Sequence, residues 1–229
     1  MKRLIALVSF FLFTAVPLFA QADLLKAVKA KLDKVADYTA TGKMNVDVSY
    51  IRVPEAPVTV YYKRPDKFAI RKADGLSILP KGGASINVST LLSGSNYSAV
   101  PAGKAVVGGL PVTVVKLLPL DENSDVVLTT LYIDEKALLV RKAAVTTRDH
   151  GSYEIEMEYG KFSSWGLPDK VAFVFNTSEY KLPKGITFEY EKGDKKPAPA
   201  AKNKKGKVEI FYSNYTINKG VSDAVFKKA

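Results

Sequence analysis

The spacing of apolar residues changes from a helical period to a strand period within the first fifty residues. Over 23–37 they recur every three or four positions with lysines between them, which predicts an amphipathic helix. Over 43–50 apolar and polar residues alternate, which predicts a half-buried strand. The prolines of 54–57 predict a turn, after which the alternation resumes at Val58. The sequence therefore predicts a helix over 23–37 with an apolar face that must be covered, followed by strands.

Strand patterns follow one another closely in the second half of the chain, after a short helix predicted over 88–92. The predicted strands are 112–118, 126–134, 138–147, 153–159, 170–176 and 208–217, with a last helical turn over 222–228. Their connections are too short to hold crossover helices, so neighbouring strands must be antiparallel. About ten strands with a few helices predict an α+β fold, in which a curved antiparallel sheet forms an incomplete β-barrel and helices cover its trough.

The first 22 residues have the three regions of a secretory signal peptide. Lys2 and Arg3 precede an apolar run over 4–19, which ends before Ala20-Gln21-Ala22. The run is shorter than the roughly 20 residues that span a bilayer and is broken by Pro17, so an uncleaved anchor is the weaker alternative. We therefore predict a signal peptide over 1–22 and one exported, soluble domain over 23–229.

The net charge of +11 is concentrated in two segments. Two of the charges lie in 1–22, and Lys192–Lys207 holds seven lysines against one aspartate, which leaves three charges on the rest of the chain. This distribution does not indicate a nucleic-acid partner. The segment 192–207 has no large apolar side chain and is predicted to be a flexible loop, which either contacts an anionic membrane surface or keeps the protein soluble.

The composition removes most catalytic and metal chemistry. The chain has no cysteine and one histidine, so thiolate nucleophiles, disulfides and multi-histidine metal sites are excluded. Asp121-x-Asn123-x-Asp125 resembles the start of a calcium loop but lacks its later glycine and glutamate. His150 lies in the turn-like sequence Asp149-His150-Gly151-Ser152, and no nucleophile elbow is present. We predict a protein that is not an enzyme and has no cofactor and no metal.

Four segments carry a resemblance to a known family. The segment Tyr61-Tyr62-Lys63-Arg64-Pro65-Asp66-Lys67-Phe68 resembles the strand-turn-strand "KRPxxF" segment of the periplasmic outer-membrane lipoprotein carriers, the LolA-like lipoprotein-sorting family. The segments 117–134, 166–171 and 211–226 resemble the broader family, in the same order along the chain. The lysine-rich insertion and an extra terminal strand depart from the carrier proper, which leaves the cargo open.

The resemblance implies an incomplete β-barrel with an α-helical lid, and a carrier that holds the acyl chains of lipoproteins between an inner-membrane donor and an outer-membrane acceptor. It also implies that Arg64 ties the barrel to the lid. Strand parity is consistent with this role, because Arg64 projects from the end of the apolar face, where its donors can meet the exposed carbonyls of a helix end. The alternative is an ordinary surface arginine.

A carrier needs a dry surface, because exposing an acyl chain to water costs about 0.8 kcal/mol per methylene. The residues predicted to line the apolar trough are Met44, Val46, Val48, Val60, Tyr62, Phe68, Ile70, Ile155, Met157, Val171, Phe173 and Phe175, with Leu25, Val28 and Leu32 from the lid. The predicted function is a monomeric, non-enzymatic periplasmic chaperone for lipoprotein sorting. The alternatives are a carrier of another envelope lipid or glycolipid, an envelope-lipid hydrolase, and a structural sheet domain with a closed core.

Overall fold

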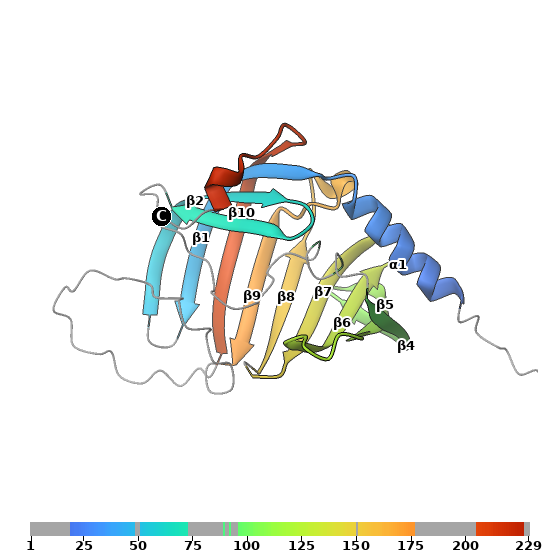
Figure 1. Ribbon diagram of the computed structural model, residues 1–229. Coiled ribbons are helices and arrows are strands. Elements are labelled where there is room, and N and C mark those ends of the chain that lie inside the picture. The colour runs from blue at the N-terminus through green and yellow to red at the C-terminus, as the bar shows by residue number, and fades with distance from the viewer. Residues whose placement is uncertain are drawn as a thin grey trace, which may run out of the picture.

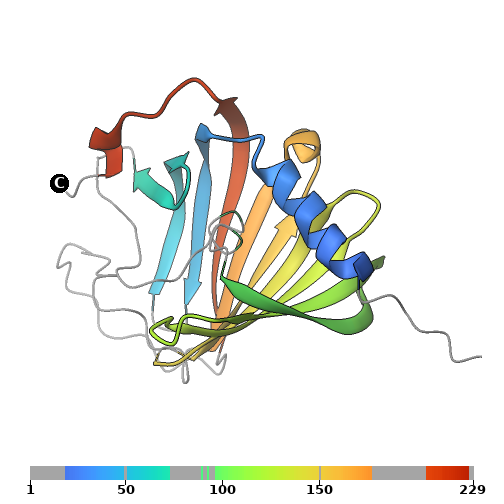
Figure 2. The same cartoon turned by 45° about the vertical axis from the view of Figure 1, so that its right-hand side comes forward.

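The computed structural model describes residues 19–48, 51–72, 89, 92, 96–149, 151–176 and 205–226. Its ten described strands form one antiparallel sheet in the order β3-β2-β1-β10-β9-β8-β7-β6-β5-β4. The two edges, β3 and β4, do not pair with each other, so the barrel is incomplete, as predicted. The sheet curls around a concave side, and α1 lies across it (Figure 1; Figure 2).

The elements have the following bounds. The helices are α1 (Phe19–Leu32), η1 (Ser163–Trp165) and η2 (Asp223–Phe226). The strands are β1 (Asp37–Val48), β2 (Ile51–Lys63), β3 (Lys67–Lys72), β4 (Tyr97–Val107), β5 (Leu110–Pro119), β6 (Val126–Asp134), β7 (Leu139–Thr147), β8 (Ser152–Glu158), β9 (Lys170–Asn176) and β10 (Lys205–Ile217). No helix within the described residues is long and apolar enough to cross a membrane.

Period-2 alternation located the central strands well. β6 and β9 have the predicted bounds, and β7 and β8 differ by one residue at their ends. The first helix ends at Leu32, five residues before the predicted end at Asp37, because Asp37 already pairs with Lys63 in the sheet. The predicted helix 88–92 lies largely outside the described residues, of which Ser89 and Leu92 are helical.

The predicted turn over 54–57 is wrong, because β2 continues through both prolines. Pro57 pairs with Lys43 of β1 on one side. On the other side β3 pairs only with Val58 to Lys63 of β2, so no strand of the described residues pairs with that edge in the first half of β2. Proline is tolerated in a strand where its missing N–H faces such an edge. The reversal expected at 54–57 instead falls before Ile51.

Strand β4 was not predicted, since Pro101 and Gly103 interrupt its pattern. The predicted loop 192–207 is too long by three residues, because β10 begins at Lys205; residues 192–204 lie outside the described part of the chain. Most of the predicted signal peptide, 1–18, also lies outside it, and α1 begins at Phe19.

The C-terminal segment covers the β3 edge of the sheet. Asp223 in η2 accepts hydrogen bonds from Lys63 at 3.0 Å and Lys67 at 2.9 Å. Arg71 donates from Nη2 to the carbonyl oxygen of Val225 at 2.7 Å. An uncovered edge strand invites pairing with another chain, and this segment restricts access to β3.

Candidate functional site

An apolar row runs across the concave face of the sheet from β1 to β5. Each of its members is directly opposite the next in the strand register: Val46, Val208, Phe173, Ile155, Ala143, Leu131 and Val115. Six of the seven are buried, and Val208 is partly buried against the same core. Seven neighbouring strands thus contribute to one continuous apolar surface.

Two shorter rows flank this central row. The first flanking row crosses β1, β10, β9 and β8 and consists of Met44, Ile210, Val171 and Met157. The second flanking row crosses the five strands from β9 to β5 and consists of Phe175, Tyr153, Val145, Thr129 and Leu117. The ring of Phe173 lies 4.8 Å from that of Tyr153 and 5.4 Å from that of Phe175, measured between centroids, so aromatic contacts connect the rows.

The structure brings most of the predicted trough residues into one core. Ten of them are buried in this core: Met44, Val46, Val60, Tyr62, Ile70, Ile155, Met157, Val171, Phe173 and Phe175. Phe68 is half-buried and packs against the core. The side chain of Val48 lies outside the described part of the structure. Their common placement supports a shared face; that they hold a ligand stays a prediction.

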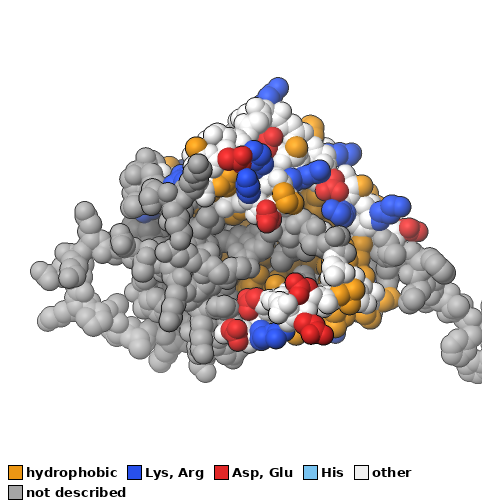
Figure 3. Space-filling view, viewed as in Figure 1, with side chains coloured by type: hydrophobic (Ala, Val, Ile, Leu, Met, Phe, Trp, Pro, Cys, Tyr) orange, Lys and Arg blue, Asp and Glu red, His pale blue; other side chains and the backbone are white. Residues whose placement is uncertain are grey.

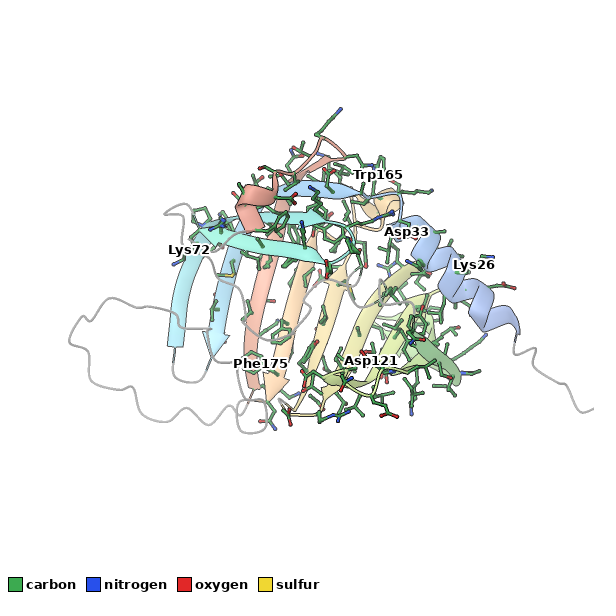
Figure 4. All side chains as sticks on the ribbon, viewed as in Figure 1. Lys26, Asp33, Lys72, Asp121, Trp165 and Phe175 are labelled. Carbon is green, nitrogen blue, oxygen red and sulfur yellow. The ribbon has the colours of Figure 1, made fainter. Side chains whose placement is uncertain are left out.

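Helix α1 packs on this face with the residues predicted for the lid. Leu25 and Val28 are buried in the core, and Leu32 packs against it half-buried. Lys26, which lies between Leu25 and Val28, is exposed and points away from the sheet (Figure 4). The helix therefore fills the trough with its apolar face.

The C-terminal end of α1 is held from two sides of the sheet. Arg64, at the end of β2, donates from Nη1 to the carbonyl oxygen of Asp33 at 2.7 Å and lies 3.3 Å from its carboxylate. Lys31 donates from Nζ to the carbonyl oxygen of Ala137, in the turn between β6 and β7, at 2.7 Å. Such contacts satisfy carbonyls that a helix end or a turn leaves without a backbone partner. Both ties hold the same end of the helix, so its other end depends on apolar contacts.

We expect Arg64→Leu to loosen the end of α1 more than it destabilises the whole protein. Arg64 is partly exposed, so its loss costs about 1 kcal/mol or less of unfolding free energy. Backbone hydrogen exchange around Asp33 should become several-fold faster. Arg148→Leu is the matched control, since Arg148 donates to the carbonyl oxygen of Glu122 at 2.9 Å, away from α1. Unchanged exchange around Asp33 would contradict the tie.

A bulge in β10 gathers tyrosines at the α1 end of the trough. The register between β1 and β10 shifts between Thr41 and Gly42, so Tyr212 and Tyr215 face the same side although they are three residues apart. Their ring centroids lie 5.1 Å apart, and Tyr38 lies 5.2 Å from Tyr215. Gly42 is required there, because a Cβ would lie within 2.3 Å of the carbonyl oxygen of Phe211.

The tyrosine hydroxyls stay protonated. Burial raises the pKa of Tyr38 well above its ordinary value, with Tyr212 and Tyr62 adding to the shift. Burial likewise raises the pKa of Tyr159, Tyr212 and Tyr215. Tyr215 donates to the carbonyl oxygen of Pro168 at 2.7 Å, and Tyr159 to that of Val140 at 2.8 Å. This end of the trough therefore offers neutral polar groups beside apolar ones.

Two cavities lie at this end, beneath α1. The larger, of about 190 Å³, is lined by Lys29, Leu32, Asp33, Tyr62, Arg64, Pro65, Ser89 and Leu92. The smaller, of about 30 Å³, has Tyr38, Tyr159, Tyr212 and Tyr215 among its lining residues and shares Leu32 and Ser89 with the larger. An apolar cavity of about 150 Å³ holds one benzene. The larger cavity, whose lining includes Lys29, Asp33 and Arg64, therefore has room for no more than a short piece of an acyl chain while α1 is in place.

Sequence reasoning missed part of this surface. The inward residues of β6 and β7, among them Leu131 and Ala143, alternate clearly enough to have been included, whereas β5 has four consecutive buried residues ending at Val115. Tyr212 and Tyr215 could not be placed together, because the bulge has no signal in period-2 alternation. Within the described residues, no group of His, Cys, Asp or Glu side chains could hold a metal ion.

Comparisons with known proteins agree on the fold. Neither a protein-family model nor a curated protein sequence matches the chain. An outer membrane lipoprotein-sorting protein domain from Vibrio parahaemolyticus is similar in structure, with a TM-score of 0.58, 12% identity and coverage of 89% of this chain and 94% of that one. A LolA superfamily protein from Nitrosomonas europaea is also similar, with a TM-score of 0.54 and 10% identity. The match covers 89% of this chain and 97% of that one. The chain has the LolA-like fold.

A third solved structure, a DUF1329 family protein from Desulfovibrio piger, gives a TM-score of 0.57 at 14% identity and covers 92% of this chain and 97% of that one. Coverage this high means that the LolA-like fold accounts for nearly the whole chain and not for one half of the sheet. The predicted fold class is therefore confirmed, and the predicted resemblance agrees with the structural neighbours.

Proposed function

We propose that this protein is a non-enzymatic periplasmic carrier that binds the acyl chains of lipoproteins in the trough beneath α1. The observation that carries the proposal is the apolar row from Val46 to Val115, which crosses seven strands without a charged residue. A bound chain gains about 0.8 kcal/mol for each methylene that it buries. An extended apolar strip on an open sheet suits a long, flexible chain better than a compact ligand.

Movement of α1 is part of the proposed function. The apolar face of the helix now covers the surface that a ligand would use, and the cavity beneath it is small. Ligand binding would replace the contacts of Leu25 and Val28 with acyl-chain contacts, while Arg64 and Lys31 keep the C-terminal end of the helix attached. Because each apolar contact of the helix is exchanged for one with the acyl chain, the free-energy cost of moving α1 is low.

The polar end of the trough gives the ligand a direction. Tyr38, Tyr212 and Tyr215 lie beside the end of α1, whereas Phe175 lies near the opposite end of the sheet (Figure 4). The ester or amide groups that join acyl chains to a lipoprotein need hydrogen-bond donors when they leave water. We place these groups at the tyrosine end and the chain ends toward Phe175.

Transfer of acylated cargo tests the proposal. Mature protein purified from its native envelope should release acylated molecules on lipid extraction, identified by mass spectrometry. In vitro, it should take up a radiolabelled lipoprotein from donor membranes, and the same polypeptide without its acyl chains should stay behind. A protein that carries no lipid and accepts no acylated peptide would contradict the proposal. If a different envelope lipid is extracted, the trough would still be the binding site, but its cargo would be that lipid and not a lipoprotein.

A further inference from the structure

The hairpin of β4 and β5 differs from the rest of the molecule in charge. Residues 97–120 contain two lysines and no aspartate or glutamate, whereas the turn that follows contains Asp121, Glu122 and Asp125. The hairpin also contains no arginine and, after Tyr97, no aromatic residue. It is a stretch of small and aliphatic residues with two positive charges.

The hairpin is also unusually exposed for its composition. Every residue of β4 from Ser98 to Lys104 is exposed, and among the described strands β4 pairs with β5 alone. At the tip, Val106 is 70% exposed and Leu110 is 41% exposed. Gly108 and Gly109 have φ values of 56° and 78°, which allow a tight turn with little bulk. The tip is therefore a narrow apolar projection.

The figures place this projection at one side of the molecule. In Figures 1 and 2 the hairpin turns back on the same side as the N-terminal end of α1. Figure 3 shows hydrophobic side chains gathered on that side of the sheet, over the region of β4 to β6. Exposed apolar clusters of this kind mark sites of contact with a partner or a membrane.

We propose that the tip of the β4–β5 hairpin inserts into the interfacial region of a membrane that contains anionic lipids. Val106 and Leu110 supply the apolar surface that enters the headgroup layer, and Lys104, next to the tip, meets the lipid phosphates. The absence of acidic residues over 97–120 removes the repulsion that such a surface would otherwise exert. This inference goes beyond the proposed carrier function, because it assigns the surface that touches the membrane.

A second copy of the chain fits this surface less well. Pairing of two edge strands needs a regular row of N–H and C=O groups, but Pro101 lacks an N–H. The register of β4 shifts between Pro101 and Lys104, which interrupts the edge further. Protein interfaces are in addition enriched in aromatic residues and arginine, which 98–119 lacks. The charge and the side-chain types of the hairpin therefore both favour a lipid membrane over a second copy of the chain as its partner.

Vesicle binding by the full mature chain tests the inference. The probes are vesicles of phosphatidylcholine with phosphatidylglycerol and vesicles of phosphatidylcholine alone. We expect binding to the first and weaker binding to the second, with a decrease as salt screens the charges. The double variant Val106→Asp with Leu110→Asp should lose about tenfold or more in binding. The matched control is Val127→Asp in β6, beside the end of β5 that lies away from the hairpin tip, where a valine is 47% exposed; it should change binding by less than about twofold.

The absence of native cysteine allows a second readout. An environment-sensitive fluorophore on Val106→Cys should shift to a less polar spectrum with anionic vesicles, and the same label on Val127→Cys should not. Equal binding by the double variant and the wild type, or equal losses in both aspartate variants, would overturn the inference. So would a spectral shift that rises with protein concentration without vesicles, which would indicate a second copy. Uptake of acylated peptide should persist in the double variant, so failure of the carrier proposal is seen separately.

Discussion

Phe173→Ala is expected to lower the free energy of unfolding by about 3–5 kcal/mol. Phe173 is 5% exposed at the centre of the apolar row, and its ring packs against Tyr153 and Phe175. Truncation removes this contact area and leaves a cavity that the rigid sheet cannot close. Urea unfolding followed by circular dichroism measures the loss. The matched control is Phe211→Ala on β10, where the ring is 40% exposed; its cost should stay below about 1 kcal/mol.

The same variant also tests the trough, because its stability should fall while its uptake of acylated peptide should not. Removing the ring widens the space beneath α1, so folded Phe173→Ala should take up acylated peptide as well as the wild type does. A closed structural core predicts no uptake by either protein. Loss of uptake in a variant that is still folded at the assay temperature would show that the ring itself is needed, and would contradict a tolerant trough.

The sequence predicted which residues of one strand share a side of the sheet. It did not predict which residues of neighbouring strands lie opposite each other. Parity placed Ile155 and Met157 on one face of β8, and both are buried. It could not say that Ile155 lies opposite Phe173 and Ala143, because register depends on turns and bulges distributed along the sheet. The trough was therefore predicted as a set of residues, and the structure supplies its order.

The unpredicted parts have identifiable physical causes. Pro54 was interpreted as a turn because proline removes a donor, but in β2 it lies where β3 does not reach. The tyrosine cluster depends on the bulge near Gly42, which inverts the parity between Tyr212 and Tyr215. The partner of Arg64 was predicted only as a helix carbonyl, since where α1 ends is set by packing and not by local propensity.

Cargo release has to overcome the contacts that hold the ligand, and the structure indicates how it could do so. α1 can return to the trough because Leu25 and Val28 already fit it without a ligand. The carrier then exchanges between two states in which similar apolar surface is covered, by the helix or by the cargo. A small free-energy difference between the states allows a membrane to decide the direction of transfer. A membrane-inserting hairpin beside α1 would bring the trough close to that membrane.

Ala143→Phe is expected to weaken acyl uptake about fifty-fold while the protein remains folded. Ala143 is fully buried between Ile155 and Leu131 in the central row, so a phenyl ring there projects into the space that a ligand would occupy. Overpacking should cost about 1–3 kcal/mol of unfolding free energy, less than the Phe173 truncation. If the ring displaces three methylenes of bound chain, uptake weakens by about 2.4 kcal/mol, or about fifty-fold.

The neighbouring alanine provides the control for this variant. Ala144 lies on the other face of β7, opposite Glu154 and Thr130, so Ala144→Phe adds the same ring outside the trough. Binding of a fluorescent acylated peptide, titrated against each variant, should separate the two alanines. Equal uptake by Ala143→Phe and the wild type would exclude the apolar row as the binding surface. A loss confined to Ala143→Phe, in protein shown to be folded at the assay temperature, would locate the cargo on the concave face, because the two substitutions add the same ring on opposite sides of the sheet.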